Sequence, residues 1–292
     1  MNYEELKKRL RNIKNLKVEN AGRSWDDRNI FSVSAFFDKE KPWVIVQAGI
    51  HSREHLSCDL VMYFVNIIDD NFEYFRALED FPNICFVPMV NPDGIQVVHY
   101  GIGVLKNARY RKIMWEITRE TDIKLIKCNA RGVDINNNFN AKFNCHKCKN
   151  SPATHGYKGA YPESEKETRV LVELTKKINP IFTMSYHLKG EEIYYDFGQC
   201  GERDKRDFEI AQVIENATSY NIKKCGDSSF GGYKDWCVEK FHIPAVTIEV
   251  GSDEYNHPVP KHAIYEIIEK NTSTLMALCV IVKIWKEYKE KI

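Results

Sequence analysis

The chain has 292 residues, of which 43% are hydrophobic, so it is long enough to bury a large core in one α/β domain. Its 42 lysine and arginine residues balance 41 aspartate and glutamate residues, and the net charge of +1 gives no electrostatic reason to expect a nucleic acid or an anionic membrane as partner. No linker or charge block divides the chain, so we expect a single domain over residues 1–292.

The N-terminal segment MNYEELKKRLRNIKNL predicts an amphipathic helix over about residues 2–15, because Leu6, Leu10 and Ile13 recur at helical spacing. Charges occur throughout this segment, unlike in a secretory signal peptide. The longest apolar run, LMALCVIVKIW, is too short to cross a bilayer and contains Lys283. We therefore expect a soluble, unexported protein of the cytoplasm.

Runs of β-branched and aromatic residues predict strands at residues 29–37, 43–49, 84–90, 181–187, 193–197 and 245–250. Helical spacing of apolar residues predicts helices at about 54–68, 164–178, 204–219 and 262–289. This alternation indicates a mainly parallel sheet with helices on both faces, a class in which functional residues follow the carboxyl ends of strands. Four polar residues stand at or just beyond such ends: His51, Asn91, His187 and Glu249.

The segment HSREH, after the strand at 43–49, has two interpretations as a metal site. In the H-x-x-E-H pattern of inverted zincins, His51 and His55 bind zinc from one helix face. That pattern requires both histidines inside a helix, whereas the strand runs to Gly49 and leaves His51 in the turn. In the second interpretation, His51 and Glu54 are the ligands, but so short a pair needs support from a third ligand and a base.

Two later residues supply that support. His187 ends a buried strand and is the natural third ligand, and three protein ligands with one open position are typical of a catalytic zinc. Glu249 lies in the otherwise apolar strand PAVTIEVG, where an unpaired carboxylate is costly unless it has a function. We interpret Glu249 as the general base for a water on Zn²⁺, with one ion per chain.

The nine cysteines are odd in number and irregularly spaced, which fits a reducing compartment better than a disulfide framework. The segment CHKCKNSPATH offers Cys145, His146, Cys148 and His155 as ligands for a second metal. A structural zinc site needs two ligand pairs at set spacing, and only one C-x-x-C is present. We therefore expect ordinary thiols in a loop.

Four segments together resemble the zinc carboxypeptidase superfamily: GIHSRE, PMVNPDG, NARGVDINNNF with SYH, and TIEVG. They occur in the order typical of that superfamily and span about two hundred residues. The resemblance implies His51, Glu54 and His187 as zinc ligands and Glu249 as general base. It also implies a mixed, mostly parallel, twisted sheet of about eight strands between two layers of helices.

Longer segments resemble one bacterial branch of the superfamily, the γ-D-glutamyl-L-diamino acid endopeptidases. They are KCNARGVDINNNF, YPESEKETRVL, SYHLKGEEIYY and GGYKDWCVEKFHIPAVTIEVG. The resemblance implies a small peptidoglycan-derived peptide as substrate, cut at the amide between γ-D-glutamate and diaminopimelate. The alternatives are a carboxypeptidase, a deacylase of N-acyl amino acids, and a non-catalytic protein that binds muropeptides.

The chain departs from the carboxypeptidase pattern at the substrate pocket. Asn137 stands where carboxypeptidases carry the arginine that clamps a terminal carboxylate, and a neutral amide cannot form that charge-assisted pair. Val238 stands where those enzymes have a tyrosine, so Tyr233 is the candidate to reach the substrate instead. Asn136 and Asn137 are expected to donate hydrogen bonds in the pocket.

The superfamily also uses an arginine to polarise the scissile carbonyl, and alignment on NARGVD puts Lys127 at its place. A lysine can donate to an oxyanion, but as a point charge and not as a planar fork. Arg131 is the alternative electrophile, and we prefer Lys127. Arg131, Lys189 and Lys234 are the cations in the matched segments that could bind substrate carboxylates.

Overall fold

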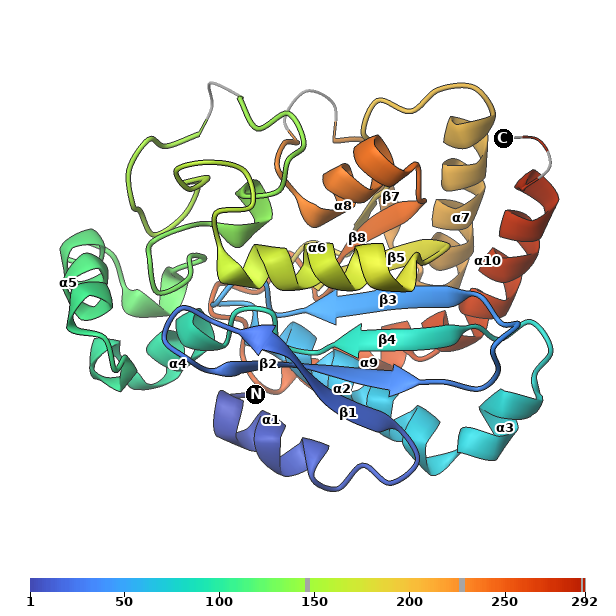
Figure 1. Cartoon of the computed structure of the whole chain (residues 1–292), viewed down its shortest axis with the longest axis horizontal. Helices are drawn as coiled ribbons and strands as arrows, with labels where there is room; N and C mark the ends of the chain where they lie inside the picture. Colours follow the sequence, from blue (N-terminus) through green and yellow to red (C-terminus); the bar gives the residue numbers. More distant parts are fainter. Residues whose placement is uncertain (145–147, 226–228, 290, 292) are drawn as a thin grey trace.

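One mixed sheet of eight strands forms the centre of the computed structural model, which describes residues 1–144, 148–225, 229–289 and 291 (Figure 1). Its spatial order is β1-β2-β4-β3-β5-β8-β6-β7. The strands are β1 (Lys17–Arg23), β2 (Asn29–Ala35), β3 (Trp43–Ala48), β4 (Asn83–Val87), β5 (Phe182–His187), β6 (Glu192–Tyr194), β7 (Asn221–Lys223) and β8 (Ala245–Glu249).

The four central strands β4, β3, β5 and β8 run parallel, as their continuous apolar sequences predict. β2 and β1 extend the sheet antiparallel on one side, and β6 pairs antiparallel with β8 on the other. The sequence did not predict β1 or β7. β1 is the polar, mostly exposed segment KVENAGR, and β7 has only three residues, so neither carries a periodic apolar signal.

Helices flank the sheet, and within the described residues they are α1 (Tyr3–Leu10), α2 (His55–Asp70), α3 (Phe72–Ala77), α4 (Pro92–Tyr100), α5 (Ala108–Ile117), α6 (Lys166–Ile178), α7 (Glu202–Thr218), α8 (Tyr233–Trp236), α9 (Ala263–Asn271) and α10 (Thr274–Tyr288).

The first helix, α1, ends at Leu10, earlier than the predicted end near residue 15. The Asp69 carboxylate accepts hydrogen bonds from the backbone N–H groups of Lys14, Asn15 and Leu16, which removes them from a helix.

The single helix predicted over 262–289 is two helices, α9 and α10. The segment NTST lies at the break, and its side chains bond to backbone carbonyls: Asn271 donates to Ile267, Thr272 to Ile268 and Thr274 to Asn271. Short polar side chains of this kind compete with regular helical hydrogen bonding. The apolar pattern gave no sign of this interruption.

Apolar side chains fill both faces of the sheet. Val44 and Val46 of β3 belong to a large core cluster with residues of α1, α2, α7, α9 and α10. Ala245 of β8 belongs to a second cluster with residues of α6 and α8. In Figure 1, α6 and α8 lie above the central strands and α1 and α2 below them. The predicted α/β class with helices on both faces is therefore confirmed.

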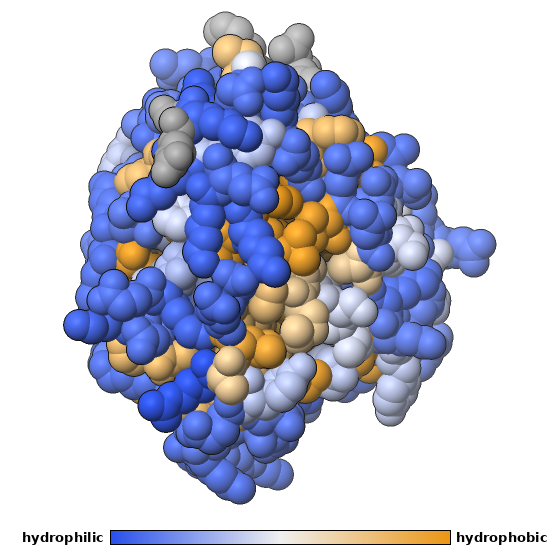
Figure 2. Space-filling model, turned by 90° about the vertical axis from the view of Figure 1, so that its right-hand side faces the viewer, coloured by the Kyte–Doolittle hydropathy of each residue, from blue (hydrophilic) through white to orange (hydrophobic). Residues whose placement is uncertain are grey.

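The outer surface is largely hydrophilic on the face shown in Figure 2, with hydrophobic residues gathered in a band near its middle. Among the helices of the described ranges, none combines the length and the apolar character needed to span a bilayer.

Candidate metal centre

Three neighbouring parallel strands end at the candidate site. β3 ends at Ala48, which pairs with Tyr186 of β5, and His187 at the end of β5 pairs with Glu249 at the end of β8. Parallel strands bring their carboxyl ends to the same edge of a sheet. The sheet therefore gathers residues from three distant parts of the sequence at one edge.

The turn after β3 depends on Gly49. Its φ angle is +66°, and a Cβ atom at this position would lie 2.4 Å from the Cys58 sulfur. The chain then turns through residues 50–54, and α2 begins at His55. His51 therefore lies outside the helix, and the one-helix geometry of the H-x-x-E-H interpretation is absent.

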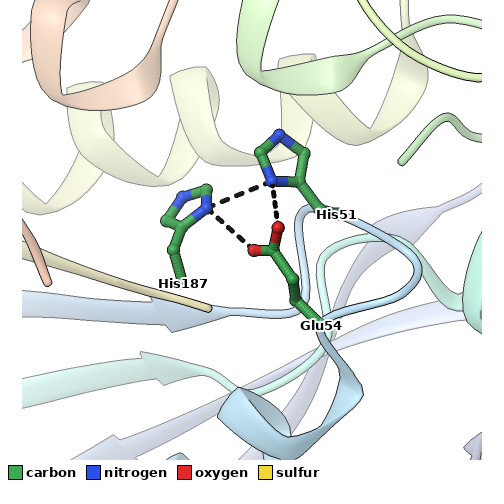
Figure 3. Close-up of side chains that lie close together, drawn as sticks. All are labelled: His51, Glu54 and His187. Atoms are coloured by element: carbon green, nitrogen blue, oxygen red, sulfur yellow. Dashed lines mark hydrogen bonds and ion pairs between the residues drawn. The ribbon is translucent and has the colours of Figure 1, made fainter. Parts of the chain in front are cut away.

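His51, Glu54 and His187 form a buried cluster, with each residue offering one donor atom (Figure 3). The Nδ1 atoms of the two histidines are 3.2 Å apart. The Glu54 carboxylate lies 2.9 Å from His51 Nδ1 through Oε1 and 3.1 Å from His187 Nδ1 through Oε2. The structure thus brings together the three residues that the sequence predicted as ligands.

This donor set fits zinc. Zinc binds imidazole nitrogen and carboxylate oxygen at about 2.0–2.2 Å in tetrahedral geometry, which separates neighbouring donor atoms by about 3.3–3.6 Å. The two histidine nitrogens are 3.2 Å apart, and each lies 2.9 or 3.1 Å from one of the two Glu54 oxygens, distances close to that range. Two imidazole nitrogens and one carboxylate oxygen, with a further open position, form a donor set typical of catalytic zinc.

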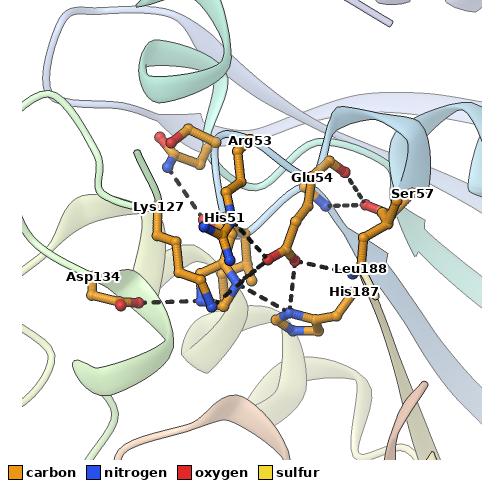
Figure 4. Close-up of polar contacts among 12 residues, drawn as sticks. His51, Arg53, Glu54, Ser57, Lys127, Asp134, His187 and Leu188 are labelled. Atoms are coloured by element: carbon orange, nitrogen blue, oxygen red, sulfur yellow. Dashed lines mark hydrogen bonds and ion pairs between the residues drawn. The ribbon is translucent and has the colours of Figure 1, made fainter. Parts of the chain in front are cut away.

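Further contacts orient the ligands (Figure 4). Asp134 Oδ1 lies 3.2 Å from His51 Nε2, and Asp134 Oδ2 accepts a hydrogen bond from the Gly156 backbone. Glu54 Oε2 also accepts a hydrogen bond from the backbone N–H of Leu188. A carboxylate on the far ring nitrogen fixes the orientation of a metal-binding histidine and makes it more basic.

Asp134 was not among the predicted site residues. Its only signal was its place in the segment GVDINNNF, together with the general need of a metal-binding histidine for an acceptor on its other nitrogen. His55 is the second histidine of the H-x-x-E-H interpretation. Its ring packs on His99 with the centroids 4.5 Å apart, outside the cluster.

The electrostatics of the cluster depend on its carboxylates. Burial disfavours the charged form of His51, but Glu54 and Asp134 outweigh it and raise the pKa of this histidine to about 9. Burial also opposes ionisation of Glu54, yet the charge of His51 and the hydrogen bonds from both histidines hold its pKa well below the usual value. Burial lowers the pKa of His187. The site is therefore built around an ionised Glu54.

Glu249 is half-buried at the end of β8 and lines a cavity of about 250 Å³. Burial, followed by the negative charge of Glu54, raises its pKa to about 8. A divalent cation held by the cluster would favour the ionised form of the carboxyl group. With a cation in the cluster, Glu249 is therefore favoured in the ionised form that a general base needs.

The two candidate electrophiles have different surroundings. Lys127 Nζ lies 3.9 Å from Glu54 Oε1, and its side chain is 29% exposed. Arg131 lies 3.3 Å from the buried carboxylate of Glu165 and stacks on Trp25 at 4.3 Å. None of the described contacts of Arg131 is with the metal cluster, so Lys127 is the better placed of the two.

Asn136 and Asn137 lie in a short 3₁₀ helix, Ile135–Asn137, at the rim of the site. Asn136 lines the Glu249 cavity, and its Oδ1 accepts a hydrogen bond from the Tyr233 backbone. A Cβ atom on Gly231 would lie 2.5 Å from the Asn137 carbonyl oxygen, so only glycine allows the two loops to pack this closely.

The prediction for Tyr233 is contradicted by its position. Its side chain is fully buried, and its hydroxyl bonds to Thr175 of α6 at 2.7 Å. Tyr233 therefore belongs to the core and not to the substrate pocket, because its ring fills the space between α8 and α6.

The two lysines predicted to bind substrate carboxylates have different surroundings. Lys189 donates to the exposed Asp253 at 2.5 Å. Lys234 is buried in the wall of the Glu249 cavity.

The segment CHKCKNSPATH, which we expected to hold ordinary thiols and no second metal, lies only partly within the described residues. Cys145 and His146 lie outside the described residues. His155 contacts Lys149 Nζ at 3.3 Å and Thr154 Oγ1 at 3.2 Å through its ring nitrogens. Within the described ranges, the group of His51, Glu54 and His187 is the one cluster of three residues arranged to hold a metal ion.

Comparisons with known proteins agree with this geometry. The family model described as zinc carboxypeptidase matches residues 3–274. The chain is 26% identical over 224 residues to γ-D-glutamyl-L-diamino acid endopeptidase 1 of Lysinibacillus sphaericus, a match that covers 73% of this chain and 55% of that protein. The chain therefore spans about half the length of this curated relative.

Solved structures share the fold. Carboxypeptidase A of Helicoverpa armigera matches with a TM-score of 0.74 at 16% identity, over 98% of this chain and 73% of that chain. Murein-tripeptide amidase MpaA of Escherichia coli matches with a TM-score of 0.57 at 21% identity, over 91% of both chains. Since the family model matches nearly the whole sequence, the chain belongs to the zinc carboxypeptidase family of metallopeptidases.

Proposed function

We propose that this protein is a zinc-dependent peptidase that hydrolyses the amide bond between γ-D-glutamate and diaminopimelate in peptidoglycan-derived peptides. The position of Glu249 is the main observation that supports a catalytic function. This carboxyl group lies in register with His187 and lines a cavity at the edge where the His51–Glu54–His187 cluster forms. A base beside a three-ligand metal cluster is the arrangement that metal-assisted amide hydrolysis requires.

His51 and His187 would hold zinc through Nδ1 and Glu54 through its carboxylate. When bound, zinc supplies Lewis acidity that lowers the pKa of a water to near neutrality and polarises a carbonyl oxygen. Glu249 takes the proton from the attacking water and later delivers it to the leaving amine. Lys127 donates a hydrogen bond to the oxygen that becomes negative in the tetrahedral intermediate.

The substrate class rests on Asn137 and on the relatives. Asn137 cannot provide the charged clamp for a terminal carboxylate, which disfavours removal of a single C-terminal residue. One relative is named as a γ-D-glutamyl-L-diamino acid endopeptidase, and a structural neighbour as a murein-tripeptide amidase. Asn136 and Asn137 supply hydrogen-bond donors at the pocket rim, while Lys189 and Arg131 are cations for more distant substrate carboxylates.

The proposal is tested with two peptides, L-Ala-γ-D-Glu-diaminopimelate and the tetrapeptide extended by D-Ala. The zinc-loaded protein is incubated with each, and the products are identified by mass spectrometry. Release of L-Ala-γ-D-Glu from both supports the proposal. Release of D-Ala alone from the tetrapeptide would indicate a carboxypeptidase, and intact peptides that remain bound would indicate a binding protein.

A further inference from the structure

The cavity beside Glu249 has a buried pair of opposite charges in its wall. Lys234 and Asp235 both line this cavity, yet they are only 4% and 1% exposed. Lys234 Nζ lies 2.7 Å from Asp235 Oδ1. Charged side chains this deeply buried are costly unless they are paired, and the position of this pair beside the candidate base suggests that it serves substrate recognition.

Lys234 has unused hydrogen-bonding capacity. Its Nζ forms an ion pair with Asp235 Oδ1 at 2.7 Å, and one N–H donates to the backbone carbonyl of Asp196 at 2.7 Å. An ammonium group carries three donors, and the third has no polar partner in the described part of the chain. The carboxylate of Asp235 raises the pKa of Lys234 against the opposing effect of burial, so the side chain stays charged.

Asp235 is held firmly on one side. Its Oδ2 accepts hydrogen bonds from the Ser229 hydroxyl at 2.7 Å and from the Gly232 backbone at 3.3 Å. Its Oδ1 faces Lys234. A carboxylate offers about four acceptor positions, so Oδ1 can accept a further hydrogen bond from a bound cation. The pair therefore presents one free donor and one free acceptor, each on a charged group.

Charge balance decides which ligand such a pair favours. A lone carboxylate on Lys234 would add negative charge to a small cavity that already holds Asp235 and Glu249. A lone ammonium group on Asp235 would leave Lys234 facing a second cation. A group that carries both charges can satisfy both residues and adds no net charge to the buried site, which avoids the desolvation cost of an unpaired ion.

We propose that Lys234 and Asp235 together recognise a zwitterionic amino acid head group, with the ligand carboxylate on Lys234 and its ammonium group on Asp235. This inference rests on the proposed function, and it adds that the residue after the scissile bond occupies the Glu249 cavity. Diaminopimelate carries such a head group at the far end of its side chain. Lysine is the same residue without the distal carboxylate, and 2-aminopimelate is the same residue without the distal amine.

Three substrates test the pair: L-Ala-γ-D-Glu followed by meso-diaminopimelate, by L-lysine or by L-2-aminopimelate. The wild-type protein should cut the diaminopimelate peptide with a kcat/KM about tenfold to a thousandfold above that for either analogue, because each analogue leaves one of the two charge-assisted hydrogen bonds to the pair unmade. Equal kcat/KM values for the three peptides would overturn the inference while leaving the proposed function intact. No cleavage of any peptide would overturn both.

Two variants test which residue binds the carboxylate of the ligand and which binds its ammonium group. Lys234→Met should lose the preference for diaminopimelate over lysine, and Asp235→Asn should lose the preference for diaminopimelate over 2-aminopimelate. A purely structural role would lower kcat/KM for all three peptides by the same factor, and that result would overturn the inference. Lys205→Met is the matched control, because Lys205 is an exposed lysine paired with Glu202 on α7. Where a variant does not fold, the wild-type ranking of the three peptides remains decisive.

Discussion

His187 and Glu249 are register partners at the ends of the adjacent parallel strands β5 and β8. The backbone N–H of Val250 donates to the His187 carbonyl at 2.9 Å, which continues the ladder one residue beyond β8. The metal ligand and the candidate base are thus fixed to each other by sheet hydrogen bonds and not by a loop. Sites built on strands hold their geometry more closely than sites built on loops. Substitutions of these two residues should therefore change metal binding or proton transfer and leave the backbone positions of the strand ends unchanged.

Glu249→Gln should keep zinc and lower kcat by about a hundredfold to ten-thousandfold, because the amide cannot accept the proton of the attacking water. Zinc content and tripeptide hydrolysis are measured on the same preparation. Glu192→Gln is the matched control, since Glu192 pairs with Glu249 in register but lies outside the cluster, and it should retain most of the activity. Full activity in Glu249→Gln would rule out this residue as the base.

Alanine at His51, Glu54 or His187 should abolish tight zinc binding, because each residue supplies one of three donor atoms. His55→Gln should bind one zinc per chain, since His55 packs on His99 outside the cluster. Metal content after gel filtration distinguishes these variants. Zinc retained in His51→Ala and lost in His55→Gln would contradict the assignment.

Asp134→Asn should weaken zinc binding by about tenfold to a hundredfold, because the neutral amide no longer makes His51 more basic through Nε2. Competition with a chromophoric chelator measures the affinity. Unchanged affinity would show that the Asp134 contact does not tune the site.

Lys127→Ala should lower kcat by about a hundredfold to a thousandfold, the usual loss for one oxyanion donor. Arg131→Ala should affect kcat less but lower the thermal midpoint of unfolding, because it leaves the buried Glu165 without its cation. Measurements of kcat and of the thermal midpoint of unfolding in both variants test the catalytic role of Lys127 and the structural role of Arg131. A larger kcat loss in Arg131→Ala than in Lys127→Ala would reverse the assignment of the electrophile.

The buried carboxyl group of Glu167 should make the free energy of unfolding depend on pH. Burial, followed by the charges of Asp93 and Glu165, raises its pKa from 4.5 to about 8. Between these values the folded chain keeps a proton that the unfolded chain releases, so the free energy of unfolding should fall as the pH rises from 4.5 to 8. Glu167→Gln removes this loss and should be more stable than the wild type at pH 8, by on the order of 2 kcal/mol.

Urea unfolding at pH 5 and pH 8 measures the Glu167 effect. The control is Glu173→Gln, an exposed position on the same helix α6, which should leave the pH dependence unchanged. A Glu167→Gln protein with the same pH dependence as the wild type would show that this carboxyl group is ionised in the folded state.

The sequence predicted the sheet class and the residues of the cluster because both signals are local. His51, His187 and Glu249 each end or follow a strongly apolar strand, and the topology brings such ends together. Strand boundaries agreed with the structure within a few residues for the central strands, where burial on both faces leaves an uninterrupted apolar run.

The substrate pocket was less predictable, because its residues come from loops placed by long-range packing. Tyr233 and Lys234 are neighbours in one short helix, yet the tyrosine enters the core against Thr175 and the lysine lines the cavity. Asp134 reaches His51 from a loop that packs on the turn after β3, where the N–H groups of Ser52 and Arg53 donate to the carbonyls of Lys127 and Ile126. No periodicity in the sequence encodes those directions.

The most direct measurement is a zinc titration of chelator-treated protein, followed by release of L-Ala-γ-D-Glu from L-Ala-γ-D-Glu-diaminopimelate. Activity should be absent without metal, rise linearly with zinc and level off at one equivalent per chain. The same titration of Glu249→Gln should bind one equivalent without restoring hydrolysis. Hydrolysis that is independent of zinc, or zinc binding without release of this dipeptide by the wild type, would contradict a zinc peptidase of this specificity.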